Sequence, residues 1–198
     1  MHKKEIAPGI VVYSNAIDEH ESLVKDIEEG MISAKLEWQE AKVKTQGEVQ
    51  IKKESRDTLV VYIPYSDTEI NDFSNFQSAF FATLSNLFLK FLSPLELDYK
   101  KDYALTTTWH DQYGILKYGV GQKFVNHIDD HTDYHRRMST IYYINDNYEG
   151  GEIEFPRFNV KYKPVANDFI IFPSNYMYNH SVSPVISGER YAVVSWAR

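Results

Sequence analysis

Two histidines and an aspartate in the second half of the sequence could together hold a metal ion. His127 and Asp129 are separated by one residue, and His180 follows much later in the chain. In a β-strand, side chains two positions apart point to the same face, so His127 and Asp129 are expected to share one space. Two imidazoles and one carboxylate form the facial ligand set that leaves open positions on non-haem iron(II). Taken alone, the His-x-Asp pair also fits a solvated strand end.

Arg190 could bind an anion in the same interior. It stands ten residues after His180, and each of the two begins an apolar stretch, with Pro184 and Gly188 between them. If these stretches pair as antiparallel strands, both side chains can enter the interior of the fold. A buried guanidinium is costly unless it meets an anion, and its fork of N–H groups matches a carboxylate. The alternative is a structural ion pair between Arg190 and an internal aspartate or glutamate.

The elements that must position these residues are strands. β-branched and aromatic runs, separated by Gly, Pro, Asn or Asp, are typical of short strands in the second half of the chain. The predicted strands are 103–109, 113–119, 124–128, 138–144, 152–155, 169–172, 179–183 and 190–196. We therefore predict an α+β fold that is mainly β. It is expected to be a double-stranded β-helix, a jelly-roll or cupin-like barrel, with N-terminal helices packed on one sheet.

The first hundred residues carry the helical patterns. Asp18 is expected to cap a helix, with Glu21 three residues later, that continues until Gly30. A second helix is predicted from about residue 68 to 92, ended by Pro94. Its apolar stripe is interpreted as core packing rather than a cofactor site, and it contains Phe73, Phe76, Phe80, Leu84, Leu87, Phe88 and Phe91.

We expect residues 1–198 to form a single domain. Residues 1–100 would supply helical support and a flap, and residues 101–198 the jelly-roll core. A short apolar run over 58–63 predicts one strand between the two helices.

Composition excludes several classes of protein. With 43% hydrophobic and 15% aromatic residues, the chain can form a core. It has no cysteine, which excludes disulfides, thiolate metal sites and cysteine nucleophiles. The net charge of −7 weighs against a nucleic-acid partner, because phosphate binding needs a basic face. The sequence begins without the apolar core of a signal peptide, and the stretch 73–89 is too polar for a membrane span. We therefore expect no membrane association and a cytoplasmic location.

The same segments resemble a known enzyme family. Five motifs stand in family order: LKYGVGQKFVNHIDDH, STIYYIND, YEGGEIEFP, KPVANDFIIFP and HSVSPVISGERYAVVSW. Together they resemble the iron(II)- and 2-oxoglutarate-dependent dioxygenases, and in finer texture the prolyl 4-hydroxylase-like branch. The resemblance covers about residues 113–198, with a weaker similarity in the N-terminal helices. Asn167 stands where the family often has glycine, and because asparagine tolerates positive φ the turn is expected to survive.

The resemblance implies iron ligation by His127, Asp129 and His180, the residues expected to be catalytic. Arg190 matches the basic residue that binds the C5 carboxylate of 2-oxoglutarate. Tyr143 matches a tyrosine that hydrogen-bonds the same carboxylate.

Three further residues are implied at the co-substrate pocket. Ser139 matches a small hydroxyl residue that helps to bind the co-substrate, Tyr118 a tyrosine that lines the pocket, and Trp196 a tryptophan in its wall. Tyr118, Tyr143 and Trp196 can each also be interpreted as ordinary core residues.

The implied reaction is a hydroxylation that uses Fe(II), 2-oxoglutarate and O2, with ascorbate as a candidate reductant and succinate and CO2 as co-products. The expected substrate is a prolyl residue in a peptide or protein. One alternative is an oxygenase acting on another residue, a free amino acid or a small metabolite. A remote alternative is a jelly-roll binding module without catalysis. The sequence does not specify an oligomeric state.

Two polar segments are candidates for substrate recognition. The segment 130–137 is dense in charge and would form either a solvated loop or a mobile lid, because loops beside rigid sheets commonly carry recognition. Its histidines, His131 and His135, are not expected to bind the metal. The lysine- and glutamate-rich segment 39–57 is a candidate second flap.

Overall fold

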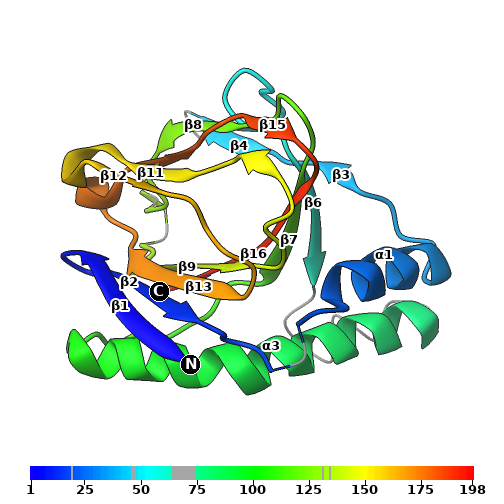
Figure 1. The fold of residues 1–198 in the computed structure, drawn as a ribbon, viewed down its shortest axis with the longest axis horizontal. Coiled ribbons are helices and arrows are strands. Elements are labelled where there is room, and N and C mark those ends of the chain that lie inside the picture. The colour runs from blue at the N-terminus through cyan, green and yellow to red at the C-terminus, as the bar shows by residue number, and fades with distance from the viewer. Residues whose placement is uncertain (19, 46–47, 64–74, 131, 134) are drawn as a thin grey trace.

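The fold consists of two facing sheets with helices against the outer side of the larger one (Figure 1). The computed structural model describes residues 1–18, 20–45, 48–63, 75–130, 132–133 and 135–198. In the described residues, the large sheet has eight strands in the order β1 (His2–Ala7), β2 (Ile10–Ser14), β13 (Asp168–Pro173), β9 (Met138–Tyr143), β16 (Arg190–Ala197), β7 (Tyr113–Tyr118), β6 (Leu59–Ile63) and β3 (Gln39–Glu40).

The small sheet closes the other side of the barrel. Its four strands are β12 (Val160–Tyr162), β11 (Ile153–Phe155), β14 (His180–Val182) and β8 (Phe124–His127). Two short pairs complete the sheets: β10 (Glu149–Gly150) with β15 (Val185–Ser187), and β4 (Val43–Thr45) with β5 (Glu48–Gln50). Two 3₁₀ turns, Pro156–Phe158 and Tyr176–Tyr178, flank β12 and β14. These two facing antiparallel sheets agree with the predicted double-stranded β-helix.

Alternation along β16 decides which residues enter the barrel. Tyr191 and Val193 pack in the core beneath the helices, whereas Ala192 and Val194 pack between the two sheets. Since neighbouring side chains in a strand point to opposite faces, Arg190 belongs to the same interior set. Sheet pairing places Arg190 opposite Tyr118 of β7. The alternation along β16 therefore places the charged side chain of Arg190 in the apolar interior between the sheets.

The first helix begins later than the sequence predicted. Helix α1 (Leu23–Ser33) has Ser22 at its N-cap position, so the expected cap at Asp18 is wrong. The Ser22 hydroxyl instead donates to Asp26 in the first turn. Gly30 does not end the helix. A Cβ at Gly30 would lie 2.3 Å from the ring of Phe80, so this glycine permits close packing of α1 on the second helix.

The second helix, α3 (Asn75–Asp102), runs through Pro94, so the predicted end at this proline is wrong. A proline inside a helix costs about 3 kcal/mol. Three apolar side chains near Pro94 are buried: Leu92, Leu95 and Tyr99. Burial of one such side chain stabilises the fold by about 1.5–3 kcal/mol. Packing against the large sheet therefore outweighs the lost backbone hydrogen bond.

The apolar stripe of α3 is core in part, as interpreted. Leu84 and Phe88 are buried beneath the sheet, but Phe76 is 75% exposed. Phe73 and the predicted helix start near residue 68 lie outside the described residues. The buried face is completed by residues that the stripe omitted, namely Phe81, Leu92, Leu95 and Tyr99.

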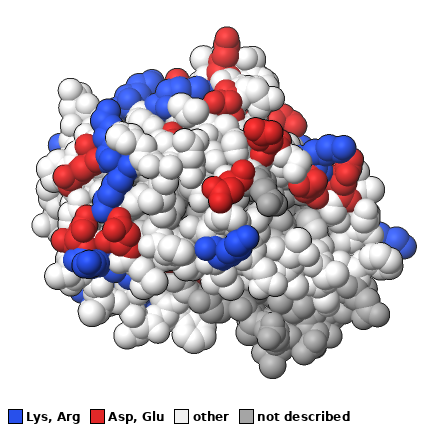
Figure 2. Space-filling model, turned by 60° about the horizontal axis from the view of Figure 1, so that its bottom comes forward, with Lys and Arg blue, Asp and Glu red and all other residues white. Residues whose placement is uncertain are grey.

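By length and composition alone, the part of α3 from Phe76 to Asp102 could cross a membrane. The sequence had predicted no membrane span here, because the stretch 73–89 carries polar residues. The same helix packs one face against the large sheet, as core helices of globular domains do. Figure 2 brings this side of the molecule forward and shows acidic and basic side chains in mixed groups separated by uncharged surface.

Most predicted strands are present, and one is wrong. Residues 103–109 contain no strand, because the chain there closes the end of α3: the N–H groups of Tyr103 and Leu105 donate to the carbonyls of Tyr99 and Lys100. The first hundred residues also supply strands β1, β2, β3 and β6 to the large sheet, in addition to helices. β2 pairs directly with β13, which extends the sheet over α3.

Asn167 adopts the left-handed conformation expected of it, with φ of 70°. Its side chain also binds the N-terminal segment. Oδ1 accepts hydrogen bonds from the Ile17 amide (2.8 Å) and the Tyr142 hydroxyl (3.2 Å), and Nδ2 donates to the Ile17 carbonyl (2.8 Å). This residue therefore joins the turn before β13 to the chain that leaves β2.

Replacing Asn167 by alanine is expected to lower the free energy of unfolding by about 2–4 kcal/mol, from left-handed strain and lost buried hydrogen bonds. For a chain of this size, the melting temperature should fall by roughly 5–15 °C. Calorimetry checks this. Asn167→Gly tolerates the backbone conformation and loses only the side-chain bonds, so its stability should lie between the two. An alanine variant as stable as the wild type would contradict the role assigned to this side chain.

Candidate metal centre and active site

The structure brings His127, Asp129 and His180 together at one end of the barrel. One ligand atom from each lies within 4.8 Å of the others. His127 ends β8, His180 begins β14, and the two are direct partners in the antiparallel pairing. Asp129 follows β8 and faces both imidazoles, with 3.6 Å from its carboxylate to His127 Nε2 and 3.7 Å to His180 Nε2. The predicted set of three is thus assembled by one strand pair.

Backbone hydrogen bonds orient both imidazoles. His127 Nδ1 lies 2.9 Å from the Val125 carbonyl, and His180 Nδ1 lies 3.1 Å from the Tyr178 carbonyl. A carbonyl only accepts, so these contacts assign the proton to Nδ1 and leave the Nε2 lone pair aimed at the centre of the cluster. Both histidines are therefore arranged as neutral nitrogen ligands.

Asp129 is held as a carboxylate. Ser139 donates to its Oδ2 at 2.7 Å, and the Ser139 hydroxyl is 2.7 Å from that of Ser174. Burial alone would raise the pKa of Asp129, but His180, His127 and the Ser139 hydroxyl together lower it well below its usual range. Burial and the neighbouring His127 lower the pKa of His180 to about 4. Two neutral imidazoles and one carboxylate are a donor set that fits Fe(II).

Arg190 is buried, and the described residues supply no counter-charge to it. It is 1% exposed, and its guanidinium lies 4.8 Å from the ring centre of Tyr118 and 5.0 Å from that of Tyr143. Its Nε and Nη1 have no hydrogen-bond partner, and no carboxylate among the described residues forms an ion pair with it. The structural ion pair considered from the sequence is therefore absent from the described residues. The orphaned N–H groups fit a ligand carboxylate.

Tyr148, which the sequence analysis did not single out, belongs to the same surroundings. In the described part of the chain, the hydroxyl groups of Tyr143 and Tyr148 are both buried without a hydrogen-bond partner. Burial raises the pKa of both, while the nearby charge of Arg190 opposes the shift. A Cβ on Gly151 would lie 2.9 Å from Arg190 and 3.0 Å from the Tyr148 ring, so the Gly-Gly turn permits this packing. The position of Tyr148 just before that turn was the available signal.

A small cavity of about 40 Å³ opens between the sheets beside these groups. It connects the metal cluster with Arg190, and its walls include Tyr118, Phe124 and Trp196. Two of the residues predicted at the co-substrate pocket, Tyr118 and Trp196, therefore lie in the wall of this cavity. Tyr143 packs against the Arg190 guanidinium but does not line the cavity. Ser139 does not line it either, and its hydroxyl donates a hydrogen bond to Asp129.

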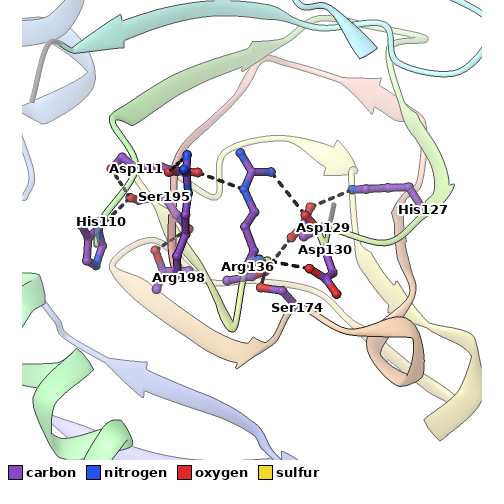
Figure 3. A network of polar contacts seen from close by, with 11 residues as sticks. His110, Asp111, His127, Asp129, Asp130, Arg136, Ser174, Ser195 and Arg198 are labelled. Atoms are coloured by element: carbon purple, nitrogen blue, oxygen red, sulfur yellow. Dashed lines mark hydrogen bonds and ion pairs between the residues drawn. The ribbon is translucent and has the colours of Figure 1, made fainter. Parts of the chain in front are cut away.

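A charged network covers the metal side of the cavity (Figure 3). Arg136 lies 3.7 Å above the ring of Trp196, and its Nε donates to Asp111 at 3.0 Å. Its Nη1 also donates to the Asp129 carbonyl at 3.4 Å, and Arg198 pairs with the same Asp111 at 2.6 Å. Arg136 is therefore held over the site by contacts with three residues. Asp111 was not identified from the sequence, and Arg136 was noted only as part of the charged segment 130–137, because their pairing is long-range.

The remaining histidines of this segment do not join the cluster in the part of the chain that is described. His135 is exposed and lies 3.3 Å from Asp130. His131 lies outside the described residues.

The candidate flap, residues 39–57, forms one wall of a larger groove outside the cavity. This groove has a volume of about 880 Å³ and reaches His127, Asp129 and Trp196. Its flap wall includes Val43 and Val49, and its opposite wall includes Trp109, which is 59% exposed. The groove is much larger than the inner cavity, and it exposes apolar and aromatic side chains beside the metal cluster.

Comparison with known proteins agrees with this geometry. Residues 113–198 match the family model of the 2OG-Fe(II) oxygenase superfamily. A PKHD-type hydroxylase of Prochlorococcus marinus (strain MIT 9215) is 39% identical over 102 residues, which are 48% of this chain and 45% of that protein. The chain therefore spans less than half the length of this curated relative.

Solved structures establish the fold. A prolyl hydroxylase from Trichoplax adhaerens, in complex with a peptide fragment of the hypoxia inducible factor oxygen degradation domain, has a TM-score of 0.70 at 18% identity. The match covers 96% of this chain and 83% of that one. A Pseudomonas putida prolyl-4-hydroxylase has a TM-score of 0.67 at 19% identity, covering 96% and 92%.

Proposed function

We propose that this chain is a 2OG-Fe(II) oxygenase and that it hydroxylates a prolyl residue in a peptide or protein, since residues 113–198 match the model of that superfamily and the similar proteins include hydroxylases. One observation carries the proposal of an oxygenase. A buried, uncompensated Arg190 shares one cavity with a His–Asp–His cluster whose lone pairs converge. A metal site that does not use 2-oxoglutarate would not require a buried arginine to bind a ligand carboxylate beside the metal.

Each residue has a defined task in this proposal. His127, Asp129 and His180 would hold Fe(II), which with 2-oxoglutarate and O2 supplies the oxidising power for C–H hydroxylation and yields succinate and CO2. Arg190 would bind the distal carboxylate of 2-oxoglutarate in two-point geometry. Ser139 orients Asp129 and keeps one of its oxygens bound. The apolar walls of the cavity exclude water from the reacting groups.

Two observations support a peptide or protein as substrate. The groove beside the metal cluster is open, and its exposed Val49 and Trp109 offer apolar contacts to an extended chain. The curated relative is named a PKHD-type hydroxylase, and the Trichoplax relative was solved with a peptide. A free amino acid would fill only a small part of this groove.

The choice between prolyl residues and other substrates is tested by supplying them in parallel. Proline-rich peptides, peptides in which proline is replaced by alanine, and free proline are incubated with Fe(II), 2-oxoglutarate and ascorbate. We expect the mass of one oxygen atom to be added to proline in the peptides alone, as read by tandem mass spectrometry. Oxygen on another residue, or on free proline only, would overturn the prolyl peptide assignment.

Removing the Tyr148 hydroxyl is expected to weaken 2-oxoglutarate binding. A neutral hydrogen bond contributes about 0.5–1.5 kcal/mol, so Tyr148→Phe should raise the KM for 2-oxoglutarate roughly 2- to 10-fold. The melting temperature should stay unchanged, because this hydroxyl has no partner within the described protein. Tyr162→Phe is the matched control, since its hydroxyl donates to Asp168 at 2.7 Å. That variant should lose stability and keep its KM; the reverse pattern would contradict the assignment.

A further inference from the structure

A second arginine, Arg56, reaches the cavity from the flap. It lies in the turn between β5 and β6 and is 9% exposed. It lines both the inner cavity and the outer groove, so it stands where the two meet. Its guanidinium lies 4.9 Å from the ring centre of Phe124, and that ring stacks on His127 with 3.5 Å between ring centres. Arg56 is thus separated from a metal-cluster residue by one aromatic ring.

Arg56 lacks a carboxylate partner among the described residues. Its Nη1 donates to the Lys42 carbonyl at 3.3 Å, a weak neutral contact, and its buried Nε has no hydrogen-bond partner. Arg136 and Arg198, which line the same groove, both pair with Asp111. A buried guanidinium without an anion is costly, so its retention calls for a ligand that supplies one.

The flap does not need this side chain to be attached. Backbone hydrogen bonds join it to β8 on both sides of Arg56: the Asp57 amide donates to Lys123 at 2.9 Å, and the Val125 amide donates to Ser55 at 2.8 Å. An isolated bridge also pairs Arg56 with Phe124 through the backbone. A purely structural role would be met by these main-chain contacts, which leaves the guanidinium available for a ligand.

The charges of 2-oxoglutarate are already matched by other groups in the proposed function. One of its carboxylates would lie at the metal and the other at Arg190. Neither carboxylate of 2-oxoglutarate is therefore left to pair with Arg56. A carboxylate that binds Arg56 must come from another molecule, which would enter through the open groove. The planar fork of N–H groups favours a carboxylate bound at two points.

We propose that Arg56 binds a carboxylate of the primary substrate, held next to the carbon that is hydroxylated. This inference rests on the proposed function for the position of the reacting carbon. The carboxylate has two possible sources with the same chemistry: an aspartate or glutamate side chain close to the target residue, or the C-terminal carboxylate of a short substrate. Arg56 is then a specificity residue that makes this enzyme select acidic substrates.

Matched peptides test the proposal. Proline-containing peptides carry Asp or Glu at each position near the proline, and each is paired with its Asn or Gln counterpart. A second set compares a free C-terminal carboxylate with its amide. The wild type should prefer the best acidic peptide over its amide partner by about tenfold or more in kcat/KM, which is typical of a charged hydrogen bond. The set that shows the preference identifies the source of the carboxylate.

Variants locate that preference at Arg56. Arg56→Met should abolish the acidic preference, and Arg56→Lys should restore part of it because the charge returns without the fork. Arg157→Met, which removes an exposed arginine outside the cavity and groove, should keep the preference of the wild type. Melting temperatures exclude a folding defect. Equal preference in the wild type and Arg56→Met would overturn the proposal.

A binding measurement separates this inference from the proposed function. The same peptides are titrated by calorimetry, without O2, into the protein loaded with Mn(II) and 2-oxoglutarate. Acid-selective binding that disappears in Arg56→Met would support the carboxylate site even if no proline is hydroxylated. Prolyl hydroxylation without acid-selective binding would confirm the proposed function and overturn the role of Arg56.

Discussion

Arg190→Met is expected to raise the KM for 2-oxoglutarate by at least about 100-fold. Two charge-assisted hydrogen bonds to one carboxylate contribute about 1.5–3 kcal/mol each, and methionine keeps the apolar stem while removing both. The side chain is 1% exposed and stacks between Tyr118 and Tyr143, so no water could replace it as a donor. Initial rates of succinate formation across a 2-oxoglutarate series measure this change.

Stability measurements on the same variant distinguish ligand binding from a structural ion pair. Removing one partner of a buried ion pair destabilises a protein by about 3–5 kcal/mol. Arg190 has no such partner among the described residues, so Arg190→Met should melt at or above the wild-type temperature when 2-oxoglutarate is absent. Arg190→Lys keeps the charge without the fork and should bind 2-oxoglutarate with intermediate affinity. A strong loss of stability with an unchanged KM would contradict the assignment.

Asp129→Asn is expected to reduce metal affinity by at least about a hundredfold and to abolish turnover. The substitution keeps the shape and the contact with Ser139, but it removes the only negative charge of the cluster. Divalent metals in such sites need the ionised carboxylate as well as neutral imidazoles. Titration with Mn(II) by calorimetry, in the absence of O2, measures the affinity without turnover.

Two further variants calibrate the effect of Asp129→Asn. Ser139→Ala removes a hydrogen bond to the ligand rather than the ligand itself, so a smaller loss of about 10- to 100-fold is expected. His135→Ala should bind Mn(II) as the wild type does, because this exposed histidine lies outside the cluster. An Asp129→Asn variant with wild-type affinity would refute a metal site at these residues.

The barrel and its metal cluster were predictable because they follow local patterns. Period-two alternation along residues 190–196 places Arg190 inside. His127 and Asp129 do come together as the His-x-Asp spacing predicted, although β8 ends at His127 and Asp129 lies in the bend that follows, so strand alternation is not the reason. The turn at Asn167 follows from the backbone preference of asparagine. For Arg190 and Asn167, the chemistry of neighbouring residues in the chain decides the structure, so no distant contact had to be known.

The parts that were missed depend on distant contacts. α3 continues past Pro94 because residues after it meet the large sheet, and no local signal outweighs a proline. β1 was overlooked because its sequence, HKKEIA, is polar and its strand lies at the sheet edge. Arg56 enters the cavity only because the flap pairs with β8 through the backbone. In a segment rich in lysine and glutamate, the positive charge of Arg56 did not distinguish it from the solvent-exposed charged residues.

Succinate formation from 2-oxoglutarate, followed by NMR with Fe(II), ascorbate and air, is the decisive measurement. Wild-type protein, His127→Ala and Arg190→Met are compared with and without a proline-rich peptide. We expect peptide-stimulated succinate and hydroxylated proline in the wild type, no product in His127→Ala, and product in Arg190→Met only at high 2-oxoglutarate. Absence of succinate in the wild type, together with no Fe(II)-dependent binding of 2-oxoglutarate, would contradict the oxygenase and leave a binding module.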